Sequence, residues 1–395
     1  MRRHPLKRHA NPSHCSPSGP PSTVGVRFIR PALSGASATL VGVGFARFAY
    51  LTLFPAMVTA QWLDGGGAGL LGALNLVGYL IGVSGGRLLA KRISVPRSLD
   101  CGMLLTALSF FACSWNGGVF WLAVWRSAAG VSGGVLMSLA GPAVQAIVEP
   151  AQRGTAGGIV IAGVGSGIIV TALAIPPLLE WGLPVTWIVL AVCTVGLWAF
   201  ARPAWPQAQI LESSERANVS SAIVLIVAYG VAGAGMVPHM LYLADLAVRG
   251  QGHTFSFAGF ALLLFGLGAL SGTLMAGRAV DRWGGARSIQ MWLALQAFAV
   301  ALVLAPPSFC LLLGAFLGGF GGIGATAVAL SRAREIADET AGIIWQYATA
   351  SFAIFQAVSS LALAFVFAHT GSHNQLFAFG LACSLVAVGM VRWLE

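Results

Sequence analysis

The sequence contains very little charge for its length. Charged residues make up 9% of the 395-residue chain, whereas hydrophobic residues make up 57%. Soluble domains typically carry about 25% charged residues. A water-soluble protein with so few charges could not cover its surface with polar groups, so the composition excludes an ordinary soluble domain. We therefore expect a lipid bilayer to surround most of this chain.

Several kinds of chemical site are also missing from the sequence. The six cysteines form no CxxC pair and no His/Cys spacing of a metal site, so we expect neither disulfides nor a bound metal. No phosphate-binding loop, dinucleotide fingerprint or nucleophile triad is present. The sequence thus predicts no enzyme and no cofactor. Transport driven by ATP would need a nucleotide-binding domain on a partner protein.

Acidic residues are fewer than basic ones. The chain has 22 Lys and Arg against 12 Asp and Glu, a formal net charge of +10. The basic residues lie in short clusters between apolar runs, a distribution typical of the cytoplasmic loops of membrane proteins. This distribution argues against a nucleic-acid-binding protein, although the net charge alone would suggest one.

The first 32 residues differ from the rest of the chain. They are basic and rich in Pro and Ser, and no apolar run follows until about Ala32. That run is long enough to span a bilayer, so we predict a disordered cytoplasmic tail over residues 1–32 rather than a cleaved signal peptide. A wrongly assigned start codon would explain these residues equally well.

Long apolar runs fill the remainder of the chain. A spanning helix needs roughly 20 apolar residues, and this length predicts six helices in an N-terminal bundle over 33–201, a cytoplasmic linker over 202–219, and six helices in a C-terminal bundle over 220–395. The predicted helices lie near 33–60, 68–90, 98–115, 118–148, 155–178, 183–201, 220–245, 256–280, 288–306, 308–333, 341–368 and 374–393.

The positions of Lys and Arg indicate the orientation. If the N-terminus is cytoplasmic, nearly every Lys and Arg between the predicted helices falls inside, and Arg249 alone falls outside. An even number of helices returns the C-terminus to the same side. We therefore predict a multi-pass protein of the bacterial cytoplasmic (inner) membrane with both termini in the cytoplasm.

The two halves of the chain repeat short patterns. The segment GRLLAKR at 86–92 follows the second predicted helix, and GRAVDRWG at 277–284 follows the eighth. Thr-Ala-Gly begins both the fifth helix, at 155–157, and the eleventh, at 340–342. Repeated halves around a polar linker predict alternating access to a solute site between the halves, near the middle of the bilayer.

These motifs resemble those of the major facilitator superfamily. Segment 277–287, GRAVDRWGGAR, is similar to its loop motif Gly-x-x-x-Asp-Arg-x-Gly-x-Arg, and the first copy has Ala90 in place of the acid. Arg126-x-x-x-Gly130 resembles a motif of the fourth helix. The glycine-rich segment 163–167 resembles the antiporter motif of the fifth helix without its Gly-Pro pair. The resemblance covers about residues 33–393.

The first two predicted helices resemble the YbfB/YjiJ branch of that superfamily. The similar segments are GFARFAY at 44–50, Pro55, Trp62-Leu63 and AGLLGALNLVGYLIG at 68–82. The resemblance implies an all-α membrane protein of twelve transmembrane helices, with two six-helix bundles related by pseudo-twofold symmetry. It also implies that helices 1, 4, 7 and 10 line a central cavity. It implies no particular substrate.

Two arginines are candidates for solute binding. Arg47 lies about mid-way along the first predicted helix, where a charge costs roughly 2.5–3.5 kcal/mol on insertion scales. Such a residue should face the bundle interior or a water-filled cavity, where it would bind an anion or the carboxylate of a zwitterion. Arg126, near the middle of the fourth helix, could share that anion or assist proton transfer. For both residues the alternative is a structural role between helices.

Two residues are candidates for carrying a coupling proton. His239 follows Pro238 in the seventh predicted helix and comes opposite Arg47 when the halves are aligned, so it is also a candidate for solute binding. Asp245 lies near the outer end of the same helix. A satisfied, non-functional histidine is the alternative for His239. Because no acid lies clearly at the centre of a predicted helix, facilitated diffusion without a coupling ion stays open.

Other polar and aromatic residues fall at membrane depth. Tyr50, Asn75 and Tyr79 are further candidates for solute binding, with hydrogen bonding between helices as the default interpretation. Similar residues in the second half are Tyr229, Gln296, Trp345, Gln346, Tyr347 and Gln356. Candidates for a gating latch in the loops after helices 2 and 8 are Arg87, Arg278, Asp281, Arg282 and Arg287. A solvated loop is the alternative there.

These observations favour a secondary transporter that moves a small organic solute by alternating access, with a proton as the candidate coupling ion. Its expected partners are the solute and the lipid bilayer, and we expect a monomer to be the functional unit. The first alternative is efflux of amphipathic or aromatic drugs, with Arg47 in a structural role. The second alternative is a membrane sensor or scaffold that transports nothing.

Overall fold

The computed structural model describes residues 29–149, 153–207, 222–336 and 341–394. Within these ranges the protein is all helical and contains no strand, so the predicted all-α class is confirmed for them. The predicted tail lies outside these ranges, except for its last residues from Ile29 onward, which begin the first helix. Most of the predicted linker, from 208 onward, also lies outside them.

The first half of the chain contains one interrupted helix followed by five continuous ones. A π-helical segment, η2, separates α1 from α2 in the interrupted helix, and a short 3-10 turn, η4, follows α7. The elements are α1 (Ile29–Thr39), η2 (Leu40–Phe48), α2 (Ala49–Thr59), α3 (Gly65–Ile93), α4 (Val95–Cys113), α5 (Gly118–Ile147), α6 (Arg153–Leu179), α7 (Leu183–Ala201) and η4 (Arg202–Ala204).

The second half of the chain contains two further π-helical segments, η6 and η7. Such segments are rare and often occur at functional sites. The elements are α8 (Ile223–Leu241), α9 (Leu243–Asp245), η6 (Leu246–Gly250), α10 (Phe255–Trp283), α11 (Gly285–Val303), α12 (Ser308–Gly318), η7 (Gly319–Ile323), α13 (Gly324–Ile336), α14 (Ala341–Thr370) and α15 (His373–Leu394).

Local sequence explains where several helices begin. The side chain of Asp64 accepts a hydrogen bond of 2.6 Å from the Gly67 amide and caps the start of α3. Thr254 caps α10 in the same way through the Phe257 amide, at 3.2 Å. Gly284, with a φ of +80°, makes the turn between α10 and α11, a conformation that favours glycine.

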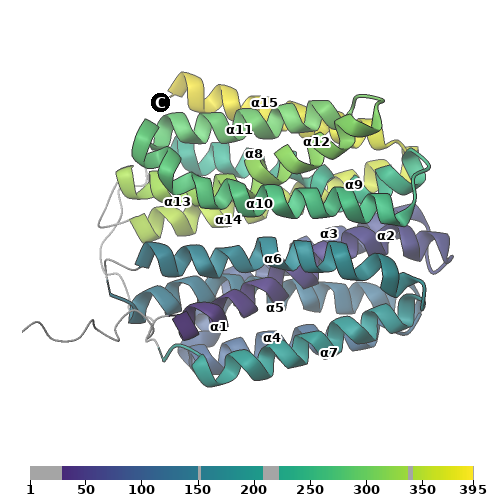
Figure 1. The fold of residues 1–395 in the computed structure, drawn as a ribbon, viewed down its shortest axis with the longest axis horizontal. Helices are drawn as coiled ribbons and strands as arrows, with labels where there is room; N and C mark the ends of the chain where they lie inside the picture. The colour runs from purple at the N-terminus through teal and green to yellow at the C-terminus, as the bar shows by residue number, and fades with distance from the viewer. Residues whose placement is uncertain (1–28, 150–152, 208–221, 337–340, 395) are drawn as a thin grey trace, which may run out of the picture.

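The helices of the two halves occupy different parts of the molecule. In Figure 1 the helices of residues 29–201, purple to teal, lie together below those of residues 223–394, green to yellow. Helix α1 begins and α15 ends at the left of the view, which we call the proximal end. The opposite end, with the loops around 60–64, 251–254 and 371–372, is the distal end.

Eleven helical segments of the described residues are long and apolar enough to cross a membrane. A multi-pass membrane protein is therefore confirmed, whereas the predicted number of twelve spans is not. The difference lies in the predicted span 98–115, which corresponds to α4. That helix carries Arg97 and Asp100 near its start, which makes it more polar than the others. It packs against α5 and α7.

Glycines let neighbouring helices approach closely. A Cβ on Gly130 of α5 would overlap the carbonyl oxygen of Asn75 in α3, and one on Gly268 of α10 would overlap the carbonyl oxygen of Phe316 in α12. Lipid-embedded helices have no hydrophobic drive toward each other, so such close backbone packing contributes much of their association. Between the halves, α3 packs on α14 and α6 packs on α10.

Candidate functional site

A small cavity of about 60 Å³ lies between the two halves of the chain. From the first half, Arg47 of η2, Tyr79 of α3 and Met137 of α5 line it. From the second half, Tyr229 of α8 and several residues of α14 line it. The wall is mostly aromatic and aliphatic, and Arg47 is the charged residue among those that line it. The cavity therefore presents one positive charge to an otherwise largely apolar space.

Arg47 has few partners for a buried cation. Its side chain belongs to the π-helical segment η2 and the residue is 6% exposed. The guanidinium carbon lies 4.2 Å from the centre of the Tyr79 ring. Nη1 donates one long hydrogen bond of 3.5 Å to Gln356 Oε1, and Nη2 is buried without a hydrogen-bond partner among the described residues. A buried charge is costly unless it is paired and hydrogen-bonded, and the charge of Arg47 is only partly compensated by the described residues.

Four residues of α14 form one face of the cavity. Trp345, Thr349, Phe352 and Gln356 all line it, and their spacing of four, three and four places them on one side of the helix. Trp345 and Gln356 are among the polar and aromatic residues predicted at membrane depth, whereas Thr349 and Phe352 are not among the predicted candidates. Their helical spacing was the signal that could have found them.

An aromatic cluster continues this face toward α8. The rings of Tyr229 and Phe352 are stacked with their centres 4.6 Å apart, and the Trp345 ring lies 6.1 Å from Tyr229. The Tyr229 hydroxyl donates a 3.0 Å hydrogen bond to Thr326 Oγ1 of α13. The hydroxyl oxygen of Thr349 is buried without a hydrogen-bond partner among the described residues. The cavity thus has an aromatic wall and an unsatisfied hydroxyl in addition to the arginine.

Arg126, Tyr50 and Asn75 form a different cluster, inside the first half. Arg126 Nη1 donates a 2.8 Å hydrogen bond to the Ala46 carbonyl of η2, and its guanidinium carbon lies 4.4 Å from the Tyr50 ring centre. Asn75 Nδ2 donates to the Arg126 carbonyl at 3.0 Å, and the Tyr50 hydroxyl donates to the Ala68 carbonyl at 2.8 Å. These three residues hold η2 against α3 and α5, behind Arg47.

His239 lies inside the second half and does not line the cavity, although the next residue, Met240, does. Its ring stacks on Phe265 at 6.3 Å and meets Phe377 edge-on at 5.5 Å. Gly318 of α12 packs directly against it, and the residue is 1% exposed. Of the six residues predicted to bind solute, the structure brings Arg47 and Tyr79 together at the cavity.

Asp245 belongs to a polar cluster at the distal end. Its carboxylate is fully buried and receives two hydrogen bonds from Arg249, one of them from Nη2 to Oδ2 at 2.8 Å. His373 Nε2 of α15 lies 2.7 Å from the same Oδ2. The sequence analysis singled out Asp245 but not its two partners, of which His373 is distant in the chain.

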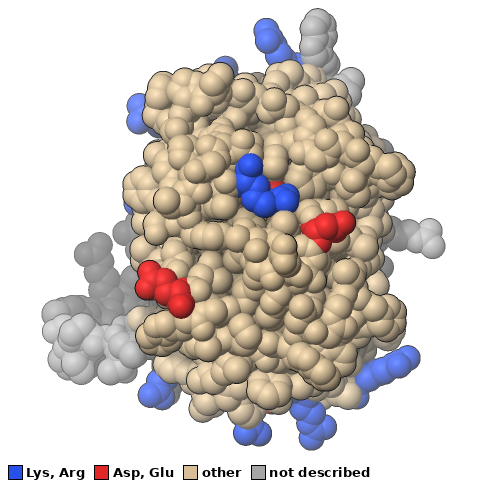
Figure 2. Space-filling model, turned by 90° about the vertical axis from the view of Figure 1, so that its right-hand side faces the viewer, with Lys and Arg blue, Asp and Glu red and all other residues tan. Residues whose placement is uncertain are grey.

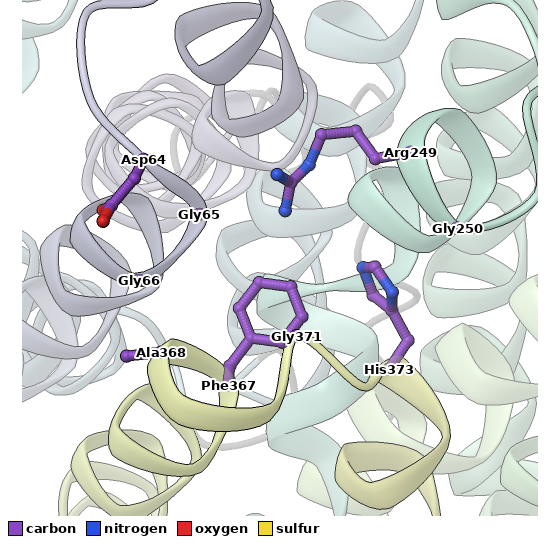
Figure 3. Close-up of a pocket in the computed structure, with 9 residues that line it drawn as sticks. All are labelled: Asp64, Gly65, Gly66, Arg249, Gly250, Phe367, Ala368, Gly371 and His373. Carbon is purple, nitrogen blue, oxygen red and sulfur yellow. The ribbon is translucent and has the colours of Figure 1, made fainter.

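The distal cluster also joins the two halves of the chain. The Arg249 guanidinium lies 5.8 Å from the Phe54 ring of α2 and 5.7 Å from the Phe367 ring of α14. It packs against Gly65, and the Tyr242 hydroxyl packs against Gly69. We call Arg249, Asp245, His373, Tyr242, Phe54 and Phe367 the distal clasp. Figure 3 shows Arg249 and His373 beside Phe367, at a pocket of about 510 Å³.

The two ends of the molecule differ in charge. Figure 2 shows the distal end, where a few charged side chains lie in a mostly uncharged surface. The charged residues that the distal loops and η6 contribute are Asp64, Glu180 and Arg249. The turn between α3 and α4 alone carries Lys91, Arg92 and Arg97 at the proximal end.

The predicted gating residues lie at the proximal end. Arg87 Nη1 donates a 2.7 Å hydrogen bond to Gln346 Oε1 of α14, which joins the two halves. Arg278, Arg282 and Arg287 are exposed, and the side chain of Asp281 lies outside the described part of the chain. Nearby, the carboxylate of Glu335 accepts hydrogen bonds from the Gly285 amide at 2.8 and 2.9 Å, which ties α13 to the start of α11.

Comparison with known proteins adds a family assignment to this geometry. The family model described as uncharacterised MFS-type transporter YbfB matches residues 39–392 of this chain. The match extends over both halves, from the end of α1 to the last turns of α15. No curated protein matches the chain.

Proposed function

The chain belongs to this family of MFS-type transporters, and we propose that it is a secondary transporter that moves a small organic anion or zwitterion across the bacterial cytoplasmic membrane by alternating access. The observation that carries this proposal is Arg47, a buried arginine whose Nη2 has no hydrogen-bond partner among the described residues and which lines a cavity between the halves. Intramembrane charges of this kind mark solute pathways in transporters.

The geometry of Arg47 supports binding of a carboxylate. A guanidinium that stacks on an aromatic face keeps its N–H groups at its edge, where they can form paired hydrogen bonds with a carboxylate. Tyr79 supplies that face, and the contact with Gln356 is long and involves a neutral oxygen. A carboxylate in the place of the Gln356 amide oxygen would form charge-assisted hydrogen bonds with Arg47. These bonds would be stronger than the long contact with Gln356 that they replace.

The size of the cavity supports alternating access. About 60 Å³ is room for roughly two water molecules, whereas binding sites for small organic molecules measure about 300–1,000 Å³. A solute can therefore occupy this site when the halves move apart. Because the distal clasp joins the halves through buried Asp245, we propose that the distal end stays closed and that the solute reaches Arg47 from the proximal end once the halves part there and the Arg87–Gln346 hydrogen bond breaks.

The charge difference between the ends supports the orientation. We propose that the proximal end is cytoplasmic, because it carries the Lys and Arg clusters. We also propose that α4 is the twelfth span. Its acid, Asp100, accepts hydrogen bonds from the indole nitrogens of Trp198 and Trp205 at 2.7 and 2.9 Å, near its proximal start. The rest of the helix, residues 101–113, is apolar or weakly polar.

A proton is our proposed coupling ion, and Asp245 is its proposed carrier. Among the described residues Asp245 is the buried acid, and its partners Arg249 and His373 belong to the distal clasp. Protonation of the carboxylate would remove the charge that holds Arg249 and so loosen the clasp. His239 is the second candidate from the sequence, and its aromatic surroundings give it no comparable link between the halves.

Uptake into proteoliposomes tests the solute site. The probes are a panel of radiolabelled monocarboxylates and their uncharged amides. We expect uptake of at least one carboxylate and not of its amide, with a loss of about tenfold or more in Arg47→Ala, because charge-assisted hydrogen bonds are lost. Arg92→Ala, which removes an exposed proximal arginine, is the matched control.

Two outcomes of this assay favour other functions. Unchanged affinity in Arg47→Ala would favour the first alternative, efflux of amphipathic or aromatic compounds, which the aromatic wall of the cavity could also accept. No flux of any probe in either direction, including aromatic dyes, would favour a sensor or scaffold.

The coupling proposal has its own test in the same vesicles. Uptake by the wild type should fall when a proton ionophore removes the pH gradient. Asp245→Asn should make uptake independent of the gradient, and His239→Gln should leave the dependence intact. Uncoupling by His239→Gln alone would move the carrier to His239. Gradient-independent uptake by the wild type would exclude the proton as the coupling ion.

A further inference from the structure

Groups along α14 are arranged in levels that suggest the shape of the solute. Gln356 lies at the level of Arg47, Phe352 lies about one turn away, and Thr349 follows another turn toward the proximal end. From Gln356 to Thr349 the helix rises about 10 Å, at 1.5 Å per residue. The cavity therefore offers an anion contact, an aromatic contact and a hydroxyl contact in that order.

Each level has a group that is available to a ligand. At the first, Arg47 Nη2 is buried and unpartnered among the described residues. At the second, Tyr229 and Phe352 stack on each other and both line the cavity, so a ligand ring can meet an edge or an outer face of the pair, and such aromatic contacts gain energy beyond that from buried area. At the third, Thr349 Oγ1 is buried and unpartnered among those residues, and a hydroxyl can both donate and accept a hydrogen bond.

From this arrangement we propose that the solute is an aromatic monocarboxylate with a hydrogen-bonding substituent, such as a hydroxyl, at the end of the ring opposite the carboxylate. The carboxylate binds the Arg47 guanidinium in place of the Gln356 amide oxygen. The ring lies against Tyr229 and Phe352, and the distant hydroxyl pairs with Thr349. This inference rests on the proposed function, because it assigns a ligand class to the same Arg47 site.

The length of such a molecule agrees with the spacing of the levels. A benzene ring with para substituents measures about 6–7 Å between its carboxylate and hydroxyl oxygens, and one hydrogen bond of about 3 Å to Thr349 brings the total near the rise of about 10 Å between Gln356 and Thr349. A short aliphatic acid would leave Thr349 unpartnered, and a dicarboxylate would place its second charge beside a neutral hydroxyl. A sugar acid would place several hydroxyls against a wall that is mostly aromatic and aliphatic, where hydroxyls without hydrogen-bond partners cost free energy.

The direct test is a binding series on the full chain, purified in detergent and titrated calorimetrically. The probes are 4-hydroxybenzoate, benzoate, cyclohexanecarboxylate and 4-hydroxybenzamide. We expect 4-hydroxybenzoate to bind most tightly, benzoate about fivefold more weakly because one neutral hydrogen bond is lost, and the saturated ring weaker again by about fivefold. The uncharged amide should bind at least about tenfold more weakly than 4-hydroxybenzoate.

Variants then assign each preference to its residue. Thr349→Val should bind 4-hydroxybenzoate and benzoate equally, and Phe352→Leu should lose the preference for the aromatic over the saturated ring. Thr194→Val and Phe365→Leu are the matched controls, because Thr194 bonds within α7 and Phe365 is exposed on α14. A thermal-unfolding midpoint near that of the wild type identifies the variants that are folded. If a variant does not fold, the ligand series on the wild type still tests the proposed class of solute.

The outcomes separate this inference from the proposed function. Arg47-dependent binding or uptake of aliphatic carboxylates with no preference for an aromatic ring would overturn the aromatic class and leave the anion site intact. A preference for 4-hydroxybenzoate that persists in Thr349→Val would overturn the placement of the hydroxyl. Binding of the amide as tightly as the carboxylate would overturn both this inference and the proposed anion site.

Discussion

Arg47 at the central cavity and Arg249 at the distal clasp are both stacked on aromatic rings, yet they differ in their partners. Arg249 forms two hydrogen bonds with the buried carboxylate of Asp245, which also contacts His373. Arg47 has one long contact with a neutral amide. Arg249 reaches the surface and has a carboxylate partner, which ties it into the clasp, whereas buried Arg47 has no carboxylate partner among the described residues.

Arg126 has a third set of partners. It is as deeply buried as Arg47, but its guanidinium donates to the Ala46 carbonyl of η2 and stacks on Tyr50. The same residue type thus serves as a clasp, a brace and a candidate ligand contact in one chain. Arg47 and Arg126 each keep one buried guanidinium nitrogen without a hydrogen-bond partner among the described residues, and Arg47 is the one of the two that lines the cavity.

The largest effect should come from breaking the clasp. Asp245→Ala leaves Arg249 without its carboxylate, and loss of one partner from a buried ion pair costs about 3–5 kcal/mol. Because the Arg249 side chain is 27% exposed, we expect about 3 kcal/mol. Thermal unfolding followed by tryptophan fluorescence measures it. The double variant Asp245→Ala/Arg249→Met should be more stable than Asp245→Ala, because it leaves no arginine without its partner. A double variant as unstable as Asp245→Ala would contradict the pairing.

A smaller effect should follow when the clasp is crowded rather than broken. In Gly69→Ala the new methyl group meets the Tyr242 hydroxyl across the two halves, at a cost of about 1 kcal/mol. The distal end should open more often, so spin labels at exposed Trp181 and Phe309 should move apart. Gly85→Ala on the same helix has open space for its methyl group, and a similar label shift in that control would refute the contact.

The smallest effect on stability is expected at Arg47. Arg47→Met removes a buried charge without leaving an acid unpaired, and replacing such groups by apolar ones is often neutral or stabilising. We expect the free energy of unfolding without solute to stay within about 0.5 kcal/mol of the wild type or to rise. Arg249→Met should lower it clearly. A loss at Arg47 as large as that at Arg249 would show that both arginines are structural.

Several features of the fold and the site could be predicted from local sequence. The predicted span 68–90 corresponds to α3, and the predicted span 308–333 corresponds to the continuous run from α12 to α13. Apolar length determines these spans, because a helix must satisfy its own backbone hydrogen bonds in lipid. The π-helical segments were not predictable, since residue composition does not distinguish them from ordinary helix.

The partners of the site residues could not be predicted in this way. Arg47 meets Gln356 and Asp245 meets His373 across long stretches of chain. Single-sequence periodicity reports which side of a helix a residue occupies, but not which helix faces that side. The same limit applies to His239, whose alignment with Arg47 in the sequence contrasts with its place between Phe265 and Phe377.

By itself, the sequence determined that this chain is a multi-pass membrane protein with positive charge concentrated on one side and a charged residue inside its first span. These properties depend on composition and local order, which act through the transfer of each segment into lipid. Only the tertiary structure decided which arginine has a carboxylate partner, which residues join the halves at the distal end, and which aromatic rings share a cavity with Arg47. Those outcomes depend on contacts between helices that are distant in the chain.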